Sequence, residues 1–241
     1  MNLLLRTASQ IVNPLDSRRR FGFGSGVTGE SAFNPLIYSP AVWLDASQET
    51  LTNGDAAQPL DFSGNGRQFK NTTSTRRPTF TTNRQNGRPG FVFDGVDDYV
   101  LPDNHLAIAM AFIVCKYNGA TFSGFSGLLN NMGGTGGAAF LIGTSGSTVI
   151  YPFDASLGTV TYRFNRAVSA SRAAPMNATG LVTVKVTSPQ TGIQPGFGGD
   201  RLLAGRWWNG DLYEALLFTT AVSDADCVLI ENYLAAKWGT P

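Results

Sequence analysis

Short apolar segments separated by turn residues run through the chain from about residue 40 onward. Residues 41–45 predict a strand that ends in a polar loop. Residues 109–115 are apolar at every position, which is typical of a strand at the centre of a sheet. In residues 181–187, valines alternate with threonine and lysine, so we expect one face of this strand in the core and the other in water. The pattern predicts an all-β protein.

Turn and capping signals mark the ends of these elements. Residues 61–66 read Asp-Phe-Ser-Gly-Asn-Gly and predict a turn, and Asn209-Gly210 between two apolar runs predicts a tight hairpin. Ser223, followed three residues later by an aspartate, resembles a capping box, and Gly239 stands where a left-handed C-terminal cap is expected. The apolar residues at helical spacing between them are Cys227, Ile230, Leu234 and Trp238. We therefore expect one short C-terminal helix packed on the β-structure.

The first 38 residues differ from the rest of the chain because they show no sustained period of strand or helix. A segment of this composition does not fold alone. We expect residues 1–38 to form an extended N-terminal arm that lies against another chain or against its own domain, which is residues 39–241. The arm residues expected to bind a partner are Arg18, Arg19, Arg20, Phe21 and Phe23. The arginines could contact phosphate, but docking on an acidic protein surface is the favoured interpretation.

Composition and charge narrow the classes of partner. Of the 241 residues, 42% are hydrophobic and 15% charged, and the formal net charge is +1. Because no basic field surrounds the chain, we expect neither nucleic acid nor a membrane as its partner. The apolar run at residues 3–5 is too short for a signal peptide, and no stretch approaches the roughly 20 apolar residues of a membrane-spanning helix.

The two cysteines, Cys115 and Cys227, lie far apart in the sequence, and each is inside an apolar segment. This placement favours two buried free thiols over a disulfide. Together with the single histidine, His105, they are too few for a structural zinc site, which usually takes four ligands. We predict no metal ligands among these residues and no cofactor.

Five short motifs follow one another between residues 41 and 239. They are Trp43-Leu44-Asp45-Ala46-Ser47, Asp61-Phe62-Ser63-Gly64-Asn65-Gly66, Phe93-Asp94-Gly95-Val96-Asp97-Asp98-Tyr99, Asn209-Gly210-Asp211-Leu212-Tyr213-Glu214 and Leu234-Ala235-Ala236-Lys237-Trp238-Gly239. In this order they resemble the concanavalin-A-like, laminin-G-like domains of phage structural proteins and bacterial surface proteins. The resemblance implies a two-sheet antiparallel jelly-roll sandwich that often presents glycan or protein ligands at loops along one edge. Residues 1–38 and 133–137 lie outside it.

Some members of the family that the chain resembles are glycoside hydrolases, which need a pair of catalytic carboxylates. The resemblance would supply their carboxylates as Glu-x-Asp-x-Glu or Glu-x-Asp-x-x-Glu on one strand, and neither pattern occurs. The four glutamates, Glu30, Glu49, Glu214 and Glu231, are each isolated. Asp97 and Asp98 would point to opposite faces of a regular strand. We therefore predict no enzymatic activity. The alternative, a glycanase with unfamiliar residues, requires hydrolysis of a polysaccharide that is lost on mutating Asp97 or Asp98.

The candidate ligand-binding residues are Trp207, Trp208, Asn209, Asp97 and Asp98. Tryptophans can stack on sugar rings or on a partner, but two adjacent ones in a strand point in opposite directions, so at most one faces solvent. The aspartates could ligate calcium together with Asp94, although a structural role in a turn is the favoured interpretation.

Lectin-type domains usually act outside a cell, whereas the sequence shows no export signal. A virion component reconciles the two, because it is made in the host cytoplasm and leaves by lysis. We therefore expect a non-enzymatic bacteriophage virion protein, either a capsid decoration or a tail or collar fibre component. Its arm would anchor it to other virion proteins, its sandwich could bind a host surface glycan, and it would be a homo-oligomer, with a trimer favoured. The alternative is a bacterial surface or secreted carbohydrate-binding module.

Overall fold

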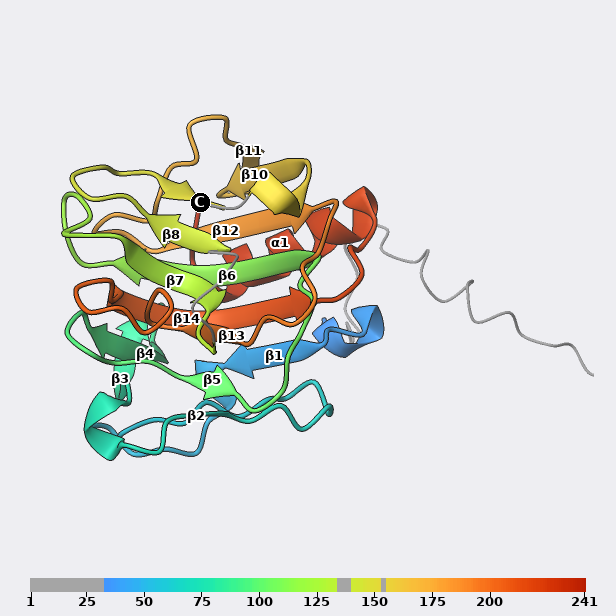
Figure 1. Ribbon diagram of the computed structural model, residues 1–241. Coiled ribbons are helices and arrows are strands. Elements are labelled where there is room, and N and C mark those ends of the chain that lie inside the picture. The colour runs from blue at the N-terminus through green and yellow to red at the C-terminus, as the bar shows by residue number, and fades with distance from the viewer. Residues whose placement is uncertain (1–32, 134–139, 153–154) are drawn as a thin grey trace, which may run out of the picture. The chain divides into compact units, whose positions relative to one another are not determined.

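The computed structural model describes residues 33–133, 140–152 and 155–241 (Figure 1). As predicted, this part of the chain is a β-sandwich of antiparallel sheets with one short C-terminal helix. The arm residues Arg18 to Arg20, Phe21 and Phe23 lie outside the described residues, so their role stays a prediction.

The larger sheet holds the strands from which the rest of the molecule is organised. Its strands are β1 (Val42–Asp45), β3 (Thr79–Gln85), β4 (Arg88–Asp94), β6 (Met110–Tyr117), β10 (Val160–Phe164), β11 (Ala167–Val168), β12 (Gly180–Val186) and β14 (Asn209–Phe218). Their order is β11-β10-β12-β6-β14-β4-β3. The strand β14 pairs with β6 along one edge, and its other edge is shared by β4 at its start and by β1 further on.

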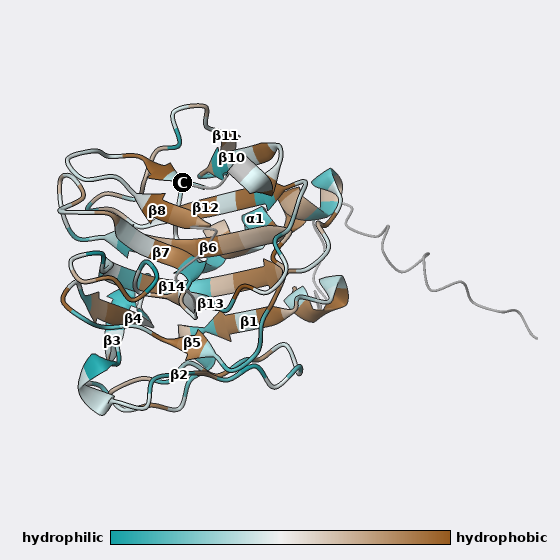
Figure 2. Ribbon diagram, in the orientation of Figure 1, coloured by the Kyte–Doolittle hydropathy of each residue, from teal (hydrophilic) through white to brown (hydrophobic). Residues whose placement is uncertain are grey.

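The smaller sheet packs in front of the larger one in the view of Figure 1. Its order is β13 (Pro195–Phe197), β7 (Ser126–Asn131), β8 (Leu141–Gly143) and β9 (Ile150–Tyr151), and a separate pair is formed by β2 (Phe69–Lys70) and β5 (Leu101–Pro102). The remaining elements before the terminal helix are short 3-10 helices at Pro35–Tyr38, Ala46–Gln48, Ser74–Arg76 and Ala155–Leu157. The brown strands of Figure 2 reflect the largely apolar core between the two sheets.

The terminal helix α1 (Asp224–Trp238) forms where the sequence predicts it and packs behind the larger sheet, against β6 and β12 (Figure 1). The Ser223 side chain caps its first turn, and Gly239 ends it in the left-handed region at φ 67°. No helix within the described residues is both long and apolar enough to cross a membrane.

The helix overturns one expectation. The face of β12 that carries Thr183 and Lys185 was expected in water, but α1 covers part of it, and Thr183 is only 1% exposed. Alternation along a strand separates two faces, but it does not reveal that a later element covers the polar one.

The hairpin predicted at Asn209-Gly210 is also wrong, because these residues begin β14 instead of turning the chain. Gly210 lies between β4 and β6, and a Cβ there would collide with the carbonyl oxygen of Lys116. The glycine therefore permits a close approach of two strands. The tight turn of this type lies at Asn86-Gly87, between β3 and β4, where both residues have positive φ, 49° and 72°.

A buried charge network joins the helix to the sheet. The Glu214 carboxylate on β14 is fully buried and accepts hydrogen bonds from Trp43 Nε1 at 2.8 Å and Trp238 Nε1 at 2.7 Å. Lys237 Nζ lies 2.7 Å from the same carboxylate and 2.5 Å from that of Asp45. Two strands and α1 thus meet at a single carboxylate.

We expect Glu214→Gln to lower the free energy of unfolding by about 3 kcal/mol, because an amide cannot accept from both indoles and leaves buried donors unpaired. Urea denaturation measures the effect. Asp224→Asn, at a side chain that is 98% exposed, is the control and is expected to change stability by less than about 0.5 kcal/mol. Equal stability of the two variants would contradict a central role for the network.

Candidate functional site

Three loops meet where β4 and β6 end and β14 begins. Residues 94–99, 118–125 and 198–209, named here the loop cluster, are joined by close contacts. Asn118 N donates to the Asn209 carbonyl at 2.8 Å, and a Cβ on Gly95 would lie 2.6 Å from that of Asn209. Because β14 runs antiparallel to both neighbours, its first residues and the last residues of β4 and β6 share one end of the sheet.

Tyr99 and Trp207 form an aromatic pair in the loop cluster. Their ring centroids are 6.1 Å apart and their planes differ by 18°, which is an offset arrangement that leaves much of each ring face uncovered by the other. Both side chains are partly exposed. Trp207 lies over Gly199, whose Cβ would come within 2.7 Å of the indole, so a glycine is required beneath the ring.

Trp208 points the other way, as the alternation of a strand predicts. It is fully buried, with its ring centroid 5.1 Å from that of Tyr117 and 6.0 Å from that of Phe122. Its indole Nε1 has no hydrogen-bond partner among the described residues. Of the two candidate tryptophans, Trp207 is therefore the one that reaches the surface.

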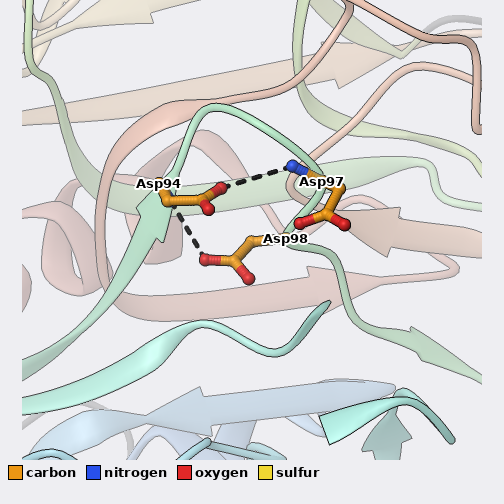
Figure 3. Close-up of side chains that lie close together, drawn as sticks. All are labelled: Asp94, Asp97 and Asp98. Atoms are coloured by element: carbon orange, nitrogen blue, oxygen red, sulfur yellow. Dashed lines mark hydrogen bonds between the residues drawn. The ribbon is translucent and has the colours of Figure 1, made fainter. Parts of the chain in front are cut away.

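Asp94, the last residue of β4, forms an acidic turn with Asp97 and Asp98 (Figure 3). Asp94 Oδ1 accepts from the backbone N–H of Val96 at 2.8 Å and of Asp97 at 3.3 Å, and Asp98 Oδ2 accepts from Asp94 N at 3.0 Å. One oxygen from each of the three carboxylates lies within 4.8 Å of the others. The expectation that Asp97 and Asp98 point to opposite faces is thus wrong, because the backbone here turns and does not continue as a strand.

The electrostatics of this turn single out Asp98, which is 5% exposed. Burial raises the pKa of Asp98 to about 7, and the nearby charges of Asp94 and Asp97 add to the increase, whereas the hydrogen bond from the Asp94 backbone opposes it. Asp97 remains partly exposed and pairs with Arg76 at 3.2 Å. The turn therefore carries fewer negative charges at neutral pH than its composition suggests.

Two kinds of chemistry are open to three carboxylates at this separation. Calcium binds several oxygens, and the three aspartates could supply some of them. A retaining glycosidase needs two carboxyl groups about 5 Å apart, one of them protonated. However, the carboxylates of Asp94 and Asp98 both accept hydrogen bonds from backbone N–H groups of the turn itself, and Asp98 is only 5% exposed. These hydrogen bonds stabilise the turn itself, whereas the choice between a purely structural role and calcium binding stays a prediction.

Sequence reasoning missed an ion-paired loop beside the aromatic pair. Asp200 is fully buried and pairs with Arg201 at 2.9 Å and with Arg206 at 2.6 Å. The Arg206 guanidinium also lies over the ring of Phe125, 4.9 Å from its centroid. The side chain of Phe125 is 38% exposed. The sequence contains one signal for this loop, which is an aspartate and two arginines within seven residues.

The other fully buried carboxylates also have cationic partners. The ion pairs are Asp211 with Arg84 and Lys116, Glu231 with Arg163, and Asp45 and Glu214 with Lys237. Groups held in this way fix neighbouring elements to one another. The candidate site is the loop cluster, which contains the predicted residues Asp97, Trp207 and Asn209 and in which Trp207 pairs with Tyr99.

We expect Asp98→Asn to stabilise the protein above pH 7. The pKa of Asp98 rises from 3.8 to about 7 on folding, so the folded state binds more protons between these values, and stability falls as the pH rises through this range. The amide removes this dependence, with a gain of about 1–3 kcal/mol at pH 8 that disappears near pH 4. Thermal denaturation from pH 4 to pH 8 measures it.

Asp97→Asn serves as the control, since it changes the charge of the same turn at a side chain that is 36% exposed. It is expected to shift stability by less than about 0.5 kcal/mol. A difference in stability between Asp98→Asn and wild type that stays constant from pH 4 to pH 8, or shrinks as the pH rises, would refute the raised pKa.

No protein-family model, curated protein or solved structure matches the chain. The concanavalin-A-like family therefore stays a resemblance carried by the five motifs.

Proposed function

We propose that this chain is a non-enzymatic structural protein of a bacteriophage virion, a capsid decoration or a tail or collar fibre component, whose sandwich binds a host surface glycan at the loop cluster. The proposal rests on the resemblance to concanavalin-A-like domains, on the composition of residues 1–38 and on the aromatic pair. Of these, the offset pair of Tyr99 and Trp207 is the observation that carries the binding role.

A glycan is the ligand that suits this surface. The apolar face of a sugar ring stacks on aromatic rings, and large rigid side chains lose little conformational entropy on binding. Polar groups lie near the pair. Asp97, on the turn that leads to Tyr99, pairs with Arg76 of the 3-10 helix Ser74–Arg76, whose carbonyl accepts from Tyr99 N at 3.1 Å, and Asn209 begins β14 just after Trp207. These groups can bond sugar hydroxyls while the rings supply apolar contact.

The ion pairs and hydrogen bonds of the buried carboxylates support the non-enzymatic part of the proposal. Each described carboxylate that is at most 1% exposed is held by a lysine or an arginine, and Asp200, the one of these in the loop cluster, binds two arginines. Asp98, which is in the same cluster and 5% exposed, accepts a hydrogen bond from the Asp94 backbone and so holds the turn together. A carboxylate committed to two cations is a poor general acid or base.

Trp207→Ala is expected to weaken glycan binding by about tenfold or more, since stacking and burial of one aromatic contributes roughly 1–3 kcal/mol. Binding to an array of bacterial surface polysaccharides identifies the ligand, and titration calorimetry then gives the change in affinity. Tyr151→Ala is the matched control, because Tyr151 is another partly exposed aromatic and lies under Arg172, outside the loop cluster.

A Trp207→Ala variant that binds the identified glycan as tightly as wild type would refute the loop cluster as the binding surface. Loss of binding in both variants would do the same, because it would point to a general effect on the fold. Polysaccharide cleavage that is abolished by Asp97→Asn or Asp98→Asn would favour a glycanase instead.

The virion assignment needs a separate experiment. Full-length protein and a variant lacking residues 1–33 are mixed with phage particles that lack the protein, and incorporation is measured after sedimentation. The deletion ends there because the 3-10 helix Pro35–Tyr38 belongs to the folded unit Asn34–Pro241. We expect only the full-length chain to be incorporated, because the arm is proposed to hold the protein in the particle. Normal incorporation of the shortened chain would overturn the anchoring role. Glycan binding without any incorporation would favour the bacterial carbohydrate-binding module.

A further inference from the structure

A cavity of about 330 Å³ lies behind the larger sheet, between the first turns of α1 and the strands β10 and β12. It is on the face opposite the smaller sheet, so it is separate from the core and from the loop cluster. Its volume is within the range of small-molecule sites. Neither the resemblance nor the proposed glycan role uses it.

The floor of the cavity is a square of four polar residues. In the register of β10 and β12, Arg163 is opposite Thr183 and Thr161 is opposite Lys185. All four line the cavity. The two cations therefore lie on one diagonal of the square and the two hydroxyls on the other, within reach of a single small group.

One of these hydroxyls has no partner. Thr183 is 1% exposed, and its Oγ1 makes no hydrogen bond to any described residue. A buried hydroxyl without a partner is unfavourable, because it has lost its bonds to water. Because this oxygen is itself covered, a ligand atom reaches it and restores the lost interaction only after the Thr183 side chain turns toward the cavity.

The two cations differ in how firmly they are held. Arg163 Nε lies 2.8 Å from the Glu231 carboxylate, which is 1% exposed, so this pair is fixed. Lys185 Nζ lies 3.3 Å from Asp224, whose side chain is 98% exposed. A pair that is this open to water contributes little, so a ligand anion can replace Asp224 at small cost.

Apolar side chains complete the walls. Met110, Cys227, Val168 and Val228 line the cavity, and the two valines are 70% and 46% exposed. At roughly 30 Å³ for each atom-sized group, the cavity holds about ten heavy atoms. Its lining therefore combines one exchangeable cation and a free hydroxyl with an apolar wall on each side.

We propose that this cavity binds a small amphipathic carboxylate, with the carboxylate on Lys185 and Thr183 and an aliphatic chain of about eight carbons against Val168 and Val228. The site is independent of the glycan role, and its test uses a different ligand and different residues.

Octanoate is the probe, and octylammonium, with the same chain and the opposite charge, is its control. Titration calorimetry on the full chain is expected to give a dissociation constant on the order of 1 mM for octanoate and no binding of octylammonium. Lys185→Gln is expected to weaken octanoate binding about tenfold, and Thr183→Val about threefold, since the first loses a charge-assisted hydrogen bond and the second a neutral one.

Matched variants separate the cavity from general effects. Lys70→Gln alters a lysine of similar exposure, 37% against 36%, that pairs with Asp103 elsewhere. Thr79→Val alters an exposed strand threonine, and both are expected to bind octanoate as wild type does. Without ligand, Thr183→Val is expected to melt no lower than wild type, because it removes an unpaired hydroxyl.

The proposal is overturned by the absence of octanoate binding at about 10 mM, by equal binding of octylammonium, or by unchanged affinity in both cavity variants.

Discussion

The ion pair between Glu214 and Lys237 is the interaction on which the rest of the structure depends, because it lies where strands β1 and β14 meet α1. Both side chains are almost wholly buried, so their charges could not be tolerated singly. Each is also bonded to other groups: Glu214 to two indoles, Lys237 to Asp45. The network therefore fixes where the helix lies on the sheet. The helix in turn covers Thr183 and forms one wall of the cavity.

An irregularity in β14 makes this arrangement possible. Asp211 and Glu214 are three residues apart, so in a regular strand they would face opposite sides of the sheet. The register against β6 shifts between Leu212 and Glu214, which leaves Tyr213 as an extra residue. Asp211 is then opposite Lys116, and Glu214 is opposite Val114, so both carboxylates point to the side covered by α1. Without the bulge, one carboxylate would enter the apolar core between the sheets.

Much of the fold could be predicted from local patterns, whereas the candidate site could be predicted only in part. The strand β6, the capped helix and the opposite directions of Trp207 and Trp208 all follow from periodicity and end signals. The Asn209-Gly210 signal was misread because the same dipeptide also serves a close approach between strands. Asp97 and Asp98 converge through a local turn, which the alternation of a regular strand does not describe. The pairing of Tyr99 with Trp207 and the cover over Thr183 depend on contacts between segments that are distant in the sequence. No local pattern encodes such contacts.

The distribution of charges is the reason why we propose binding at two surfaces and not at the buried carboxylates. Buried ion pairs such as those of Asp211 and Asp200 cannot exchange a partner without leaving an uncompensated charge, so they are unsuited to a ligand that comes and goes. The pairs of Arg76 with Asp97 and of Lys185 with Asp224 are open to water and weak. Each lies beside apolar surface that a ligand can cover: the aromatic pair in one case and the valines of the cavity in the other. Reversible binding is favoured where a charged side chain in a weak ion pair lies next to exposed apolar surface. The apolar contact supplies affinity, and the charge selects the ligand.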